Sequence, residues 1–302
     1  MKGGGHPGAA PAGMKLALGG AQFGMAYGAT NTAGQPDPAV VAAILDRASA
    51  AGIDLIDTAP AYGSSEAVIG AQPAAQDFRV VTKTPAGNAL LEDPDGLETR
   101  LRHSLAQLGR DRLEGLLFHN ADVLLSPGGE TLFTRAEALR EAGLVARIGV
   151  SVYDAEQIRA VLARHAPQIV QLPMNVLDQR LIRSGVLDEL AARGIELHVR
   201  SAFLQGVLLA DPAALPGRFD DLRPHLTRWR HLVAEAGLTP AAAALGFLRS
   251  LPQVERIVVG VQDADQLDEL IAAHDSPVPL PDFSALSLED PQLVDPRHWR
   301  AA

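Results

Sequence analysis

Residues 147–174, RIGVSVYDAEQIRAVLARHAPQIVQLPM, hold two short apolar runs separated by a longer amphipathic stretch. The runs Arg147–Ser151 and Gln168–Met174 have the length and the Ile, Val and Leu content of buried strands. The stretch between them, Asp154–Arg164, places apolar residues at helical spacing and begins with a good helix-capping residue. The segment therefore predicts a strand, a helix and a second strand that belong to one parallel sheet.

The same alternation continues along most of the chain. The eight expected strands are Leu16–Gly20, Ile53–Asp57, Arg79–Lys83, Glu114–His119, Arg147–Ser151, Gln168–Met174, Ile195–Arg200 and Arg256–Gly260. The eight expected helices are Asp37–Ala51, Ser64–Gly70, Asp95–Leu108, Gly129–Ala142, Asp154–Arg164, Ser184–Arg193, Thr239–Arg249 and Asp263–Ala273. Eight such repeats predict an α/β protein, a single (β/α)₈ TIM barrel. An open doubly wound sheet would carry G-x-G-x-x-G after its first strand, and residues 18–24, LGGAQFG, do not have that spacing.

The barrel is expected to occupy residues 14–275, with a helical insertion at Arg218–Ala236 between the seventh and eighth strands. Residues 1–13 consist mainly of Gly, Pro and Ala and lack the apolar core of a signal peptide, so we expect a disordered N-terminal extension. Residues 276–302 are rich in proline and are expected to form a C-terminal tail that packs on the barrel.

Composition limits the partners and the compartment. Of the 302 residues, 26 are basic and 36 are acidic, which leaves a net charge of −10 and disfavours nucleic acids and anionic membranes as partners. No apolar run is long enough to span a bilayer. The chain has no cysteine, so disulfides, thiolate nucleophiles and zinc–sulfur sites are excluded, and no metal site is expected. We expect a soluble, cytoplasmic protein that is a monomer or a weak homo-oligomer.

Polar side chains end three successive strands: Asp57 the second, Lys83 the third and His119 the fourth, while Tyr62 follows Asp57 on the same loop. In a barrel of this kind these strand ends meet at one mouth. Each residue alone has an ordinary explanation, since Asp57 could cap a turn, His119 could begin a polar loop, and Tyr62 and Lys83 could lie on the surface. A coincidence that brings all four residues to one mouth is less expected than any one of these explanations alone.

Together these four groups suit carbonyl reduction. A phenol, whose pKa is about 10, releases its proton poorly at neutral pH, and a nearby ammonium favours the phenolate. A carboxylate holds the ammonium in place, and an imidazole can orient a carbonyl oxygen. Because no protein side chain supplies a hydride, such a site needs a nicotinamide cofactor.

Residues 57–66, DTAPAYGSSE, followed by Gly70, resemble the D-T-A-x-x-Y-G-x-S-E-x-x-x-G signature of the aldo-keto reductases. The segments that end at Lys83 and His119 match the two motifs that follow. The resemblance covers most of the chain. It implies that Tyr62 is the general acid, that Lys83 eases release of its proton, that Asp57 pairs with Lys83, and that His119 orients the substrate carbonyl.

The resemblance also implies a cofactor site. Ser151 and Gln171 match residues that contact the nicotinamide carboxamide, although the family often has Asn where this chain has Val152. Arg200 stands where many members stack an aromatic ring on the nicotinamide, and a planar guanidinium can stack there instead. The remaining residues implied for the cofactor are Gly20, Phe23, Ser201, Leu204, Gln205, Gly206, Gly260, Gln262, Gln266 and Glu269.

NADPH is the cofactor that the family uses by default, and members that prefer it offer Lys or Arg to the 2′-phosphate. This chain has Asp263, Asp265 and Gln266 in that region and no basic residue between Gly260 and His274. Two carboxylates near a phosphate dianion are unfavourable, so NADH is the alternative.

The expected substrate is a small-molecule carbonyl compound, either a small aldehyde or a sugar-derived carbonyl, in contact with Phe23, Met25, Tyr27 and His119. Two other hypotheses remain open at this point. The chain could be a non-catalytic, cofactor-binding regulatory protein on the same barrel. It could also be a barrel isomerase or lyase that uses Lys83 as a Schiff-base amine.

Overall fold

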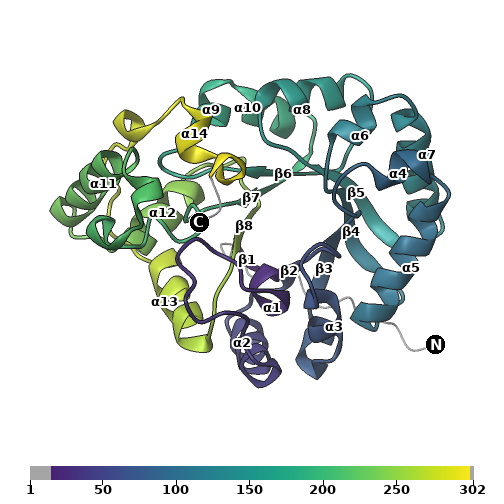
Figure 1. Ribbon diagram of the computed structural model, residues 1–302, viewed down its shortest axis with the longest axis horizontal. Coiled ribbons are helices and arrows are strands. Elements are labelled where there is room, and N and C mark those ends of the chain that lie inside the picture. The colour runs from purple at the N-terminus through teal and green to yellow at the C-terminus, as the bar shows by residue number, and fades with distance from the viewer. Residues whose placement is uncertain (1–14, 300–302) are drawn as a thin grey trace.

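The computed structural model describes residues 15–299, so the predicted N-terminal extension at residues 1–13 lies outside the described residues. Eight parallel strands form a closed barrel with the helices outside it (Figure 1). The strands are β1 Leu16–Gly19, β2 Leu55–Asp57, β3 Arg79–Lys83, β4 Leu113–Phe118, β5 Val145–Ser151, β6 Ile169–Pro173, β7 Glu196–Arg200 and β8 Arg256–Val259. The predicted (β/α)₈ barrel is confirmed, and β1 closes it by pairing with both β2 and β8.

The eight predicted helices are present, with each end within two residues of the expected position. They are α2 Pro38–Ala50, α3 Ser65–Gly70, α5 Gly96–Leu108, α7 Gly129–Glu141, α8 Ala155–Leu162, α10 Val186–Ala192, α12 Pro240–Arg249 and α13 Ala264–His274. The insertion between β7 and β8 contains η2 Pro212–Ala214, η3 Gly217–Phe219 and α11 Arg223–Glu235. Short elements that the sequence did not predict are α1 Ala21–Gly24, η1 Pro73–Asp77, α4 Ala89–Glu92, α6 Asp122–Leu125, α9 Arg180–Arg183, η4 Ser284–Leu286, α14 Pro291–Val294 and η5 Pro296–His298.

Local capping explains several helix starts. Asp154, Thr239 and Asp263 each accept a hydrogen bond from a backbone N–H of the first turn that follows, at 2.8 to 3.1 Å. Ser184 was expected to begin a helix, but it ends α9, and Gly185 takes the N-cap position of α10.

Two apolar layers hold the barrel together. Inside the ring of strands, one small cluster consists of Ala17, Leu55, Val81, Leu117 and Ile169. A much larger cluster fills the space between the strands and the surrounding helices. Because side chains fill the interior, the barrel is a packed core and its chemistry is confined to its ends.

Ion pairs close the end of the barrel at which the strands begin. Arg79 pairs with Asp54 at 2.6 Å and reaches Glu114 at 3.5 Å, and Arg147 pairs with Glu114 and Glu196. Arg256 lies 3.1 Å from Asp54 on the other side, and His198 lies 2.8 Å from Glu196. Three arginines and three carboxylates thus balance one another, which leaves the opposite end of the barrel for the site.

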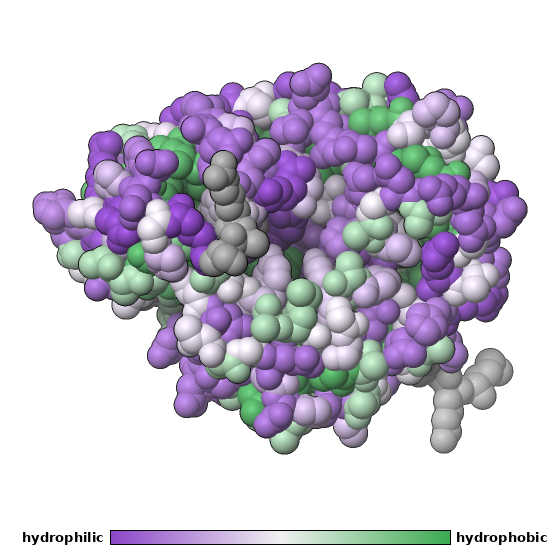
Figure 2. Space-filling model, in the orientation of Figure 1, coloured by the Kyte–Doolittle hydropathy of each residue, from purple (hydrophilic) through white to green (hydrophobic). Residues whose placement is uncertain are grey.

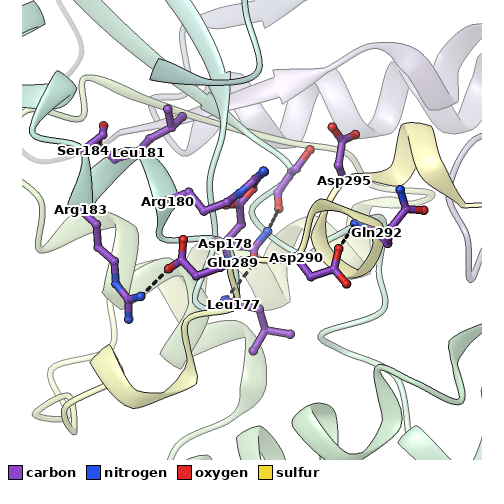
Figure 3. A network of polar contacts seen from close by, with 12 residues as sticks. Leu177, Asp178, Arg180, Leu181, Arg183, Ser184, Glu289, Asp290, Gln292 and Asp295 are labelled. Atoms are coloured by element: carbon purple, nitrogen blue, oxygen red, sulfur yellow. Dashed lines mark hydrogen bonds and ion pairs between the residues drawn. The ribbon is translucent and has the colours of Figure 1, made fainter. Parts of the chain in front are cut away.

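The last described segment lies against the loop that follows β6, as Figure 3 shows. Leu288 donates its N–H to the oxygen of Leu177 at 2.8 Å, and Arg183 and Glu289 point toward one another as an ion pair. In Figure 1 this segment, which includes α14, lies on the same side of the barrel as α9 and α10.

Among residues 15–299, no single helix has both the length and the apolarity that crossing a bilayer requires. Only α11 and α12 taken together do so, and the chain bends by 88° between them.

Candidate active site

A buried ion pair lies at the strand ends of β2 and β3. Asp57 ends β2 and Lys83 ends β3, and both side chains are almost fully buried. The Lys83 Nζ donates to both carboxylate oxygens of Asp57, at 2.8 and 2.6 Å, and to the backbone oxygen of Thr58 at 3.1 Å. All three donors of the ammonium therefore have acceptors, which fixes the position of its charge.

The environment keeps Lys83 protonated. Burial alone lowers the pKa of Lys83, but Asp57 and Tyr62 together, through charge and hydrogen bonding, outweigh burial and raise the pKa above its ordinary value. A Schiff base requires a neutral amine as nucleophile. The geometry therefore argues against Lys83 as a Schiff-base residue.

Tyr62 and His119 complete the cluster. The Lys83 Nζ lies 5.0 Å from the centroid of the Tyr62 ring, and the Tyr62 and His119 rings meet edge to face with centroids 5.9 Å apart. The backbone N–H of His119 donates to Thr84 Oγ1 at 3.1 Å, which anchors the end of β4 to that of β3. The structure thus brings together the four side chains that the sequence predicted to meet.

His119 is neutral at neutral pH. Burial, together with the nearby charge of Lys83, lowers the pKa of His119 to about 4. Its Nδ1 is buried and has no hydrogen-bond partner among the described residues. A neutral imidazole carries one N–H donor, which suits contact with a carbonyl oxygen.

Gln171 extends the cluster across the barrel. It lies in β6, is fully buried, and donates from Nε2 to Asp57 Oδ1 at 2.7 Å. A carboxylate only accepts, so the amide nitrogen must face Asp57 and the amide oxygen must face away. That oxygen, Oε1, is buried without a partner among residues 15–299. An unpaired buried acceptor fits a ligand that brings an N–H donor, such as a carboxamide.

A cavity of about 470 Å³ begins at Asp57 and Tyr62. It continues past Arg200 and the loop after β7 to Gly260 and to Glu269 on α13. Figure 2 shows that this face of the molecule is largely hydrophilic and hollowed near the centre of the barrel. The volume lies within the size range of cofactor pockets, and the lining extends from the end of β2 to α13, which suits a dinucleotide.

Many of the residues that the resemblance implied for the cofactor line this cavity. They are Arg200, Ser201, Gln205, Gly206, Gly260, Gln262, Gln266 and Glu269. Ser151 and Gln171 are buried in the strand ends beside it. Gly20 and Leu204 are buried and do not line the cavity, and the Gly20 oxygen accepts from Ser65 Oγ at 2.7 Å.

The three residues after β1 that were expected to contact the substrate are separated. Tyr27 lines the cavity and is 37% exposed. Met25 is equally exposed but lies outside the cavity. Phe23, expected at both the cofactor and the substrate, has no exposed surface, because the short helix α1 turns its ring into the core.

The loop after β7 has an unusual backbone. Ser201, Leu204 and Gln205 have φ values of 62°, 50° and 55°, and no other non-glycine residue in the described range has a positive φ. Such conformations cost about 1–3 kcal/mol each and cluster at ligand-binding segments. This loop forms one wall of the cavity.

Sequence reasoning missed several residues of this site. Gln22, Thr30 and Asn31 line the cavity from the segment after β1, where the backbone N–H of Ala29 donates to the Gln205 oxygen at 3.1 Å. No motif marks them, since their position depends on how two loops meet. Tyr153 lies outside the cavity lining, but its ring contacts Arg200 of the lining and also Arg297, which is distant in sequence.

The charges at the two ends of the cavity differ. Among the described residues that line it, the basic side chain is Arg200, whose charge acts on Tyr27. At the other end the lining includes Gln262, Gln266 and the Glu269 carboxylate. None of the described residues that line the cavity near Glu269 is basic. This agrees with the sequence, which has no basic residue between Gly260 and His274.

Known proteins resemble this chain in sequence and in fold. The NADH-specific methylglyoxal reductase of Escherichia coli K12 is 27% identical over 258 residues, which cover 74% of this chain and 78% of that protein. The L-glyceraldehyde 3-phosphate reductase of E. coli O157:H7 is 25% identical over 76% of this chain and 78% of its own length. A solved aldo-keto reductase from Bacillus halodurans shares the fold, with a TM-score of 0.70, 18% identity and 95% coverage of both chains.

The model of the Aldo/keto reductase family matches residues 15–287, which is nearly all of the described chain. The site described above lies entirely within the matched residues. The chain belongs to the Aldo/keto reductase family and is an oxidoreductase that acts on carbonyl compounds.

Proposed function

We propose that this protein reduces a small aldehyde or ketone to the alcohol, with Tyr62 as the proton donor. The observation that carries the proposal is the meeting of Tyr62, Lys83, Asp57 and His119 beside the cavity. A bound reduced nicotinamide dinucleotide would supply the hydride that no side chain can supply.

Each of the four residues has one task in this proposal. The neutral His119 ring donates its N–H to the carbonyl oxygen and orients it. Tyr62 gives its proton to that oxygen as negative charge develops there. The Lys83 ammonium stabilises the phenolate left on Tyr62, and Asp57 keeps that ammonium charged and fixed. Solvent then returns a proton to Tyr62 through the mouth.

Residues of the cavity would hold the cofactor. The unpaired Oε1 of Gln171 suits the carboxamide, and the strained loop at Ser201–Gly206 forms the wall beside the cavity's middle. The lining near Gly260 and Glu269 suits the adenosine end. These groups bind and orient, whereas the electrons come from the cofactor.

The first test replaces Tyr62 by phenylalanine and measures kcat/KM for methylglyoxal, a small aldehyde named in one relative. Loss of a general acid lowers the rate by about 10²–10⁴-fold. The same preparation should bind NADH with unchanged affinity and unfold at an unchanged temperature. Undiminished turnover would contradict the role of Tyr62 as the proton donor and would mean that another group supplies the proton.

We further propose that NADH is preferred over NADPH. The supporting observation is the Glu269 carboxylate at the far end of the cavity, with no basic residue in the segment 261–273. A 2′-phosphate placed there meets a like charge without a compensating cation. A relative named as NADH-specific points the same way.

Parallel titrations with NADH and NADPH check this preference. We expect a dissociation constant at least tenfold lower for NADH, since tenfold corresponds to about 1.4 kcal/mol. The variant Glu269→Arg should reverse the order, because it removes a repulsion and adds a cation. Asp265→Arg is the matched control, since it makes the same charge change on α13 outside the cavity lining. Equal affinities in the wild type would refute the preference.

A further inference from the structure

Arg200 is a cation in the cavity wall without a carboxylate partner. It ends β7 and is half-buried, and its Nη2 donates only to the backbone oxygen of Val152, at 3.3 Å. Two other arginines nearby, Arg180 and Arg297, are paired with Asp178 and Asp295. No ion pair of residues 15–299 includes Arg200, so no fixed anion among them balances its charge.

The Tyr153 ring carries two guanidinium groups. The Arg200 Cζ lies 4.4 Å from its centroid and the Arg297 Cζ lies 3.2 Å from it. Arg297 is neutralised, because its Nε and Nη2 donate to the two carboxylate oxygens of the nearly buried Asp295. The Arg200 guanidinium therefore remains over this ring without a carboxylate partner among the described residues.

The position of this charge indicates which molecule it meets. The guanidinium contacts Val152 and Tyr153, which follow β5, and its charge contributes to the lowered pKa of His119, which follows β4. The cavity runs the other way, toward β8 and α13. The charge thus lies on the side of the mouth where the carbonyl is reduced, away from the end assigned to adenosine.

We propose that Arg200 selects substrates that carry an oxyanion, a carboxylate or a phosphate, on the same molecule as the carbonyl held by Tyr62 and His119. The inference rests on the proposed carbonyl reduction and adds a substrate class to it. A guanidinium fork matches both oxyanions bidentately. The net charge of −10 repels anions at long range, but salt screens that repulsion beyond about 8–10 Å, whereas the contact itself is short.

The test uses two pairs of substrates that differ in charge. The first pair is 4-carboxybenzaldehyde and its methyl ester, and the second is glyceraldehyde 3-phosphate and glyceraldehyde. We expect the wild type to favour the anionic member of at least one pair by tenfold or more in kcat/KM. Arg200→Gln should abolish that preference mainly through KM, so that the ratio of kcat/KM between the anionic and the neutral member falls to about one. Arg200→Lys, which keeps the charge but not the fork, should retain part of it.

Arg218→Gln is the matched control. Arg218 lies outside the cavity lining, where its guanidinium lies over the Phe219 ring and donates to the backbone oxygen of Ala29 at 3.4 Å. The control should keep the full preference. A loss of preference in this variant would overturn the assignment, because it would reflect the net charge of the molecule instead of a contact at Arg200.

The phosphates of the cofactor are the other source of an oxyanion for Arg200. NADH titration distinguishes binding of these phosphates from binding of the substrate. If Arg200→Gln weakens NADH binding more than tenfold and leaves the substrate preference intact, the inference is overturned. It is also overturned if the wild type shows no preference within either pair. If neither member of any pair is reduced, the proposed function fails instead. In that case thermal unfolding in the presence of NADH and 4-carboxybenzyl alcohol tests anion binding by itself. If Arg200 binds the carboxylate, the alcohol raises the unfolding temperature of the wild type but not that of Arg200→Gln; if it raises neither or both, the inference is overturned.

Discussion

Asp57 is the residue on which the site depends at the smallest scale. Its carboxylate accepts two hydrogen bonds from Lys83 and one from Gln171, and nearly all of it is buried. Removing one partner of a buried ion pair leaves the other charge in a medium that solvates it poorly, which costs about 3–5 kcal/mol. Replacing both partners by apolar groups avoids that cost.

A double-mutant cycle measures this coupling. We expect Lys83→Met to abolish turnover and to lower the free energy of unfolding by about 3–5 kcal/mol. The double variant Lys83→Met/Asp57→Leu should be at least about 2 kcal/mol more stable than the sum of the single changes predicts. The exposed pair Arg102–Glu98, 2.7 Å apart, is the control and should couple by less than about 0.5 kcal/mol in denaturant unfolding. A coupling at Lys83 and Asp57 as small as this would contradict the buried-pair argument.

At the scale of elements, the strands and long helices could be predicted because each carries a full apolar run or several turns of periodicity. Helices of four residues carry neither, so α1, α6 and α14 gave no signal. The predicted position of Phe23 differs from the observed one for this reason. A loop after the strand would leave the Phe23 ring at the mouth, whereas α1 turns the ring into the core. Motif residues such as Asp57 could be placed, but Tyr153 could not, because its neighbours come from separate segments.

The helix α1 also sets the position of Tyr62. Its last residue, Gly24, accepts a hydrogen bond from the Ser64 N–H at 3.2 Å, and a side chain on Gly24 would overlap the backbone of Tyr62 and Ser65. Only a residue without a Cβ allows the two segments to approach so closely. The short helix and the signature loop are thus fitted to one another.

We expect Gly24→Ala to displace Tyr62 and to lower kcat/KM by about 10²-fold, the loss typical of a misplacement of about 1 Å. Overpacking should also cost about 1–3 kcal/mol in the free energy of unfolding. Gly217→Ala is the control, because its nearest neighbour, Asp220 Oδ2, is 3.6 Å from the added carbon and no positive φ is required. If kcat/KM is the same in both variants, α1 does not position Tyr62.

At the scale of the whole molecule, the barrel separates a charge-balanced end from a reactive one. The ion pairs around Arg147 and Asp54 lie where the strands begin, and Asp57 and Lys83 lie where they end. His198 lies between them: it is fully buried, bonded to Glu196, and close enough to Asp57 and Lys83 to respond to their charges. Protonation of this one histidine therefore disturbs both ends.

Burial, only partly offset by attraction to Asp57, lowers the pKa of His198 to about 3, compared with about 6.5 when the chain is unfolded. Between these values the unfolded chain binds the additional proton, so this contribution to stability is complete above pH 6.5 and is lost as the pH falls toward 3. His198 should thus account for about 2 kcal/mol of the stability lost between pH 7 and pH 5. Denaturant unfolding of His198→Gln should show a correspondingly shallower decline over this range, although the variant is less stable at pH 7. The control His231→Gln, at an exposed histidine, should decline in parallel with the wild type. A decline in His198→Gln as steep as that of the wild type would mean that His198 is already charged in the folded barrel.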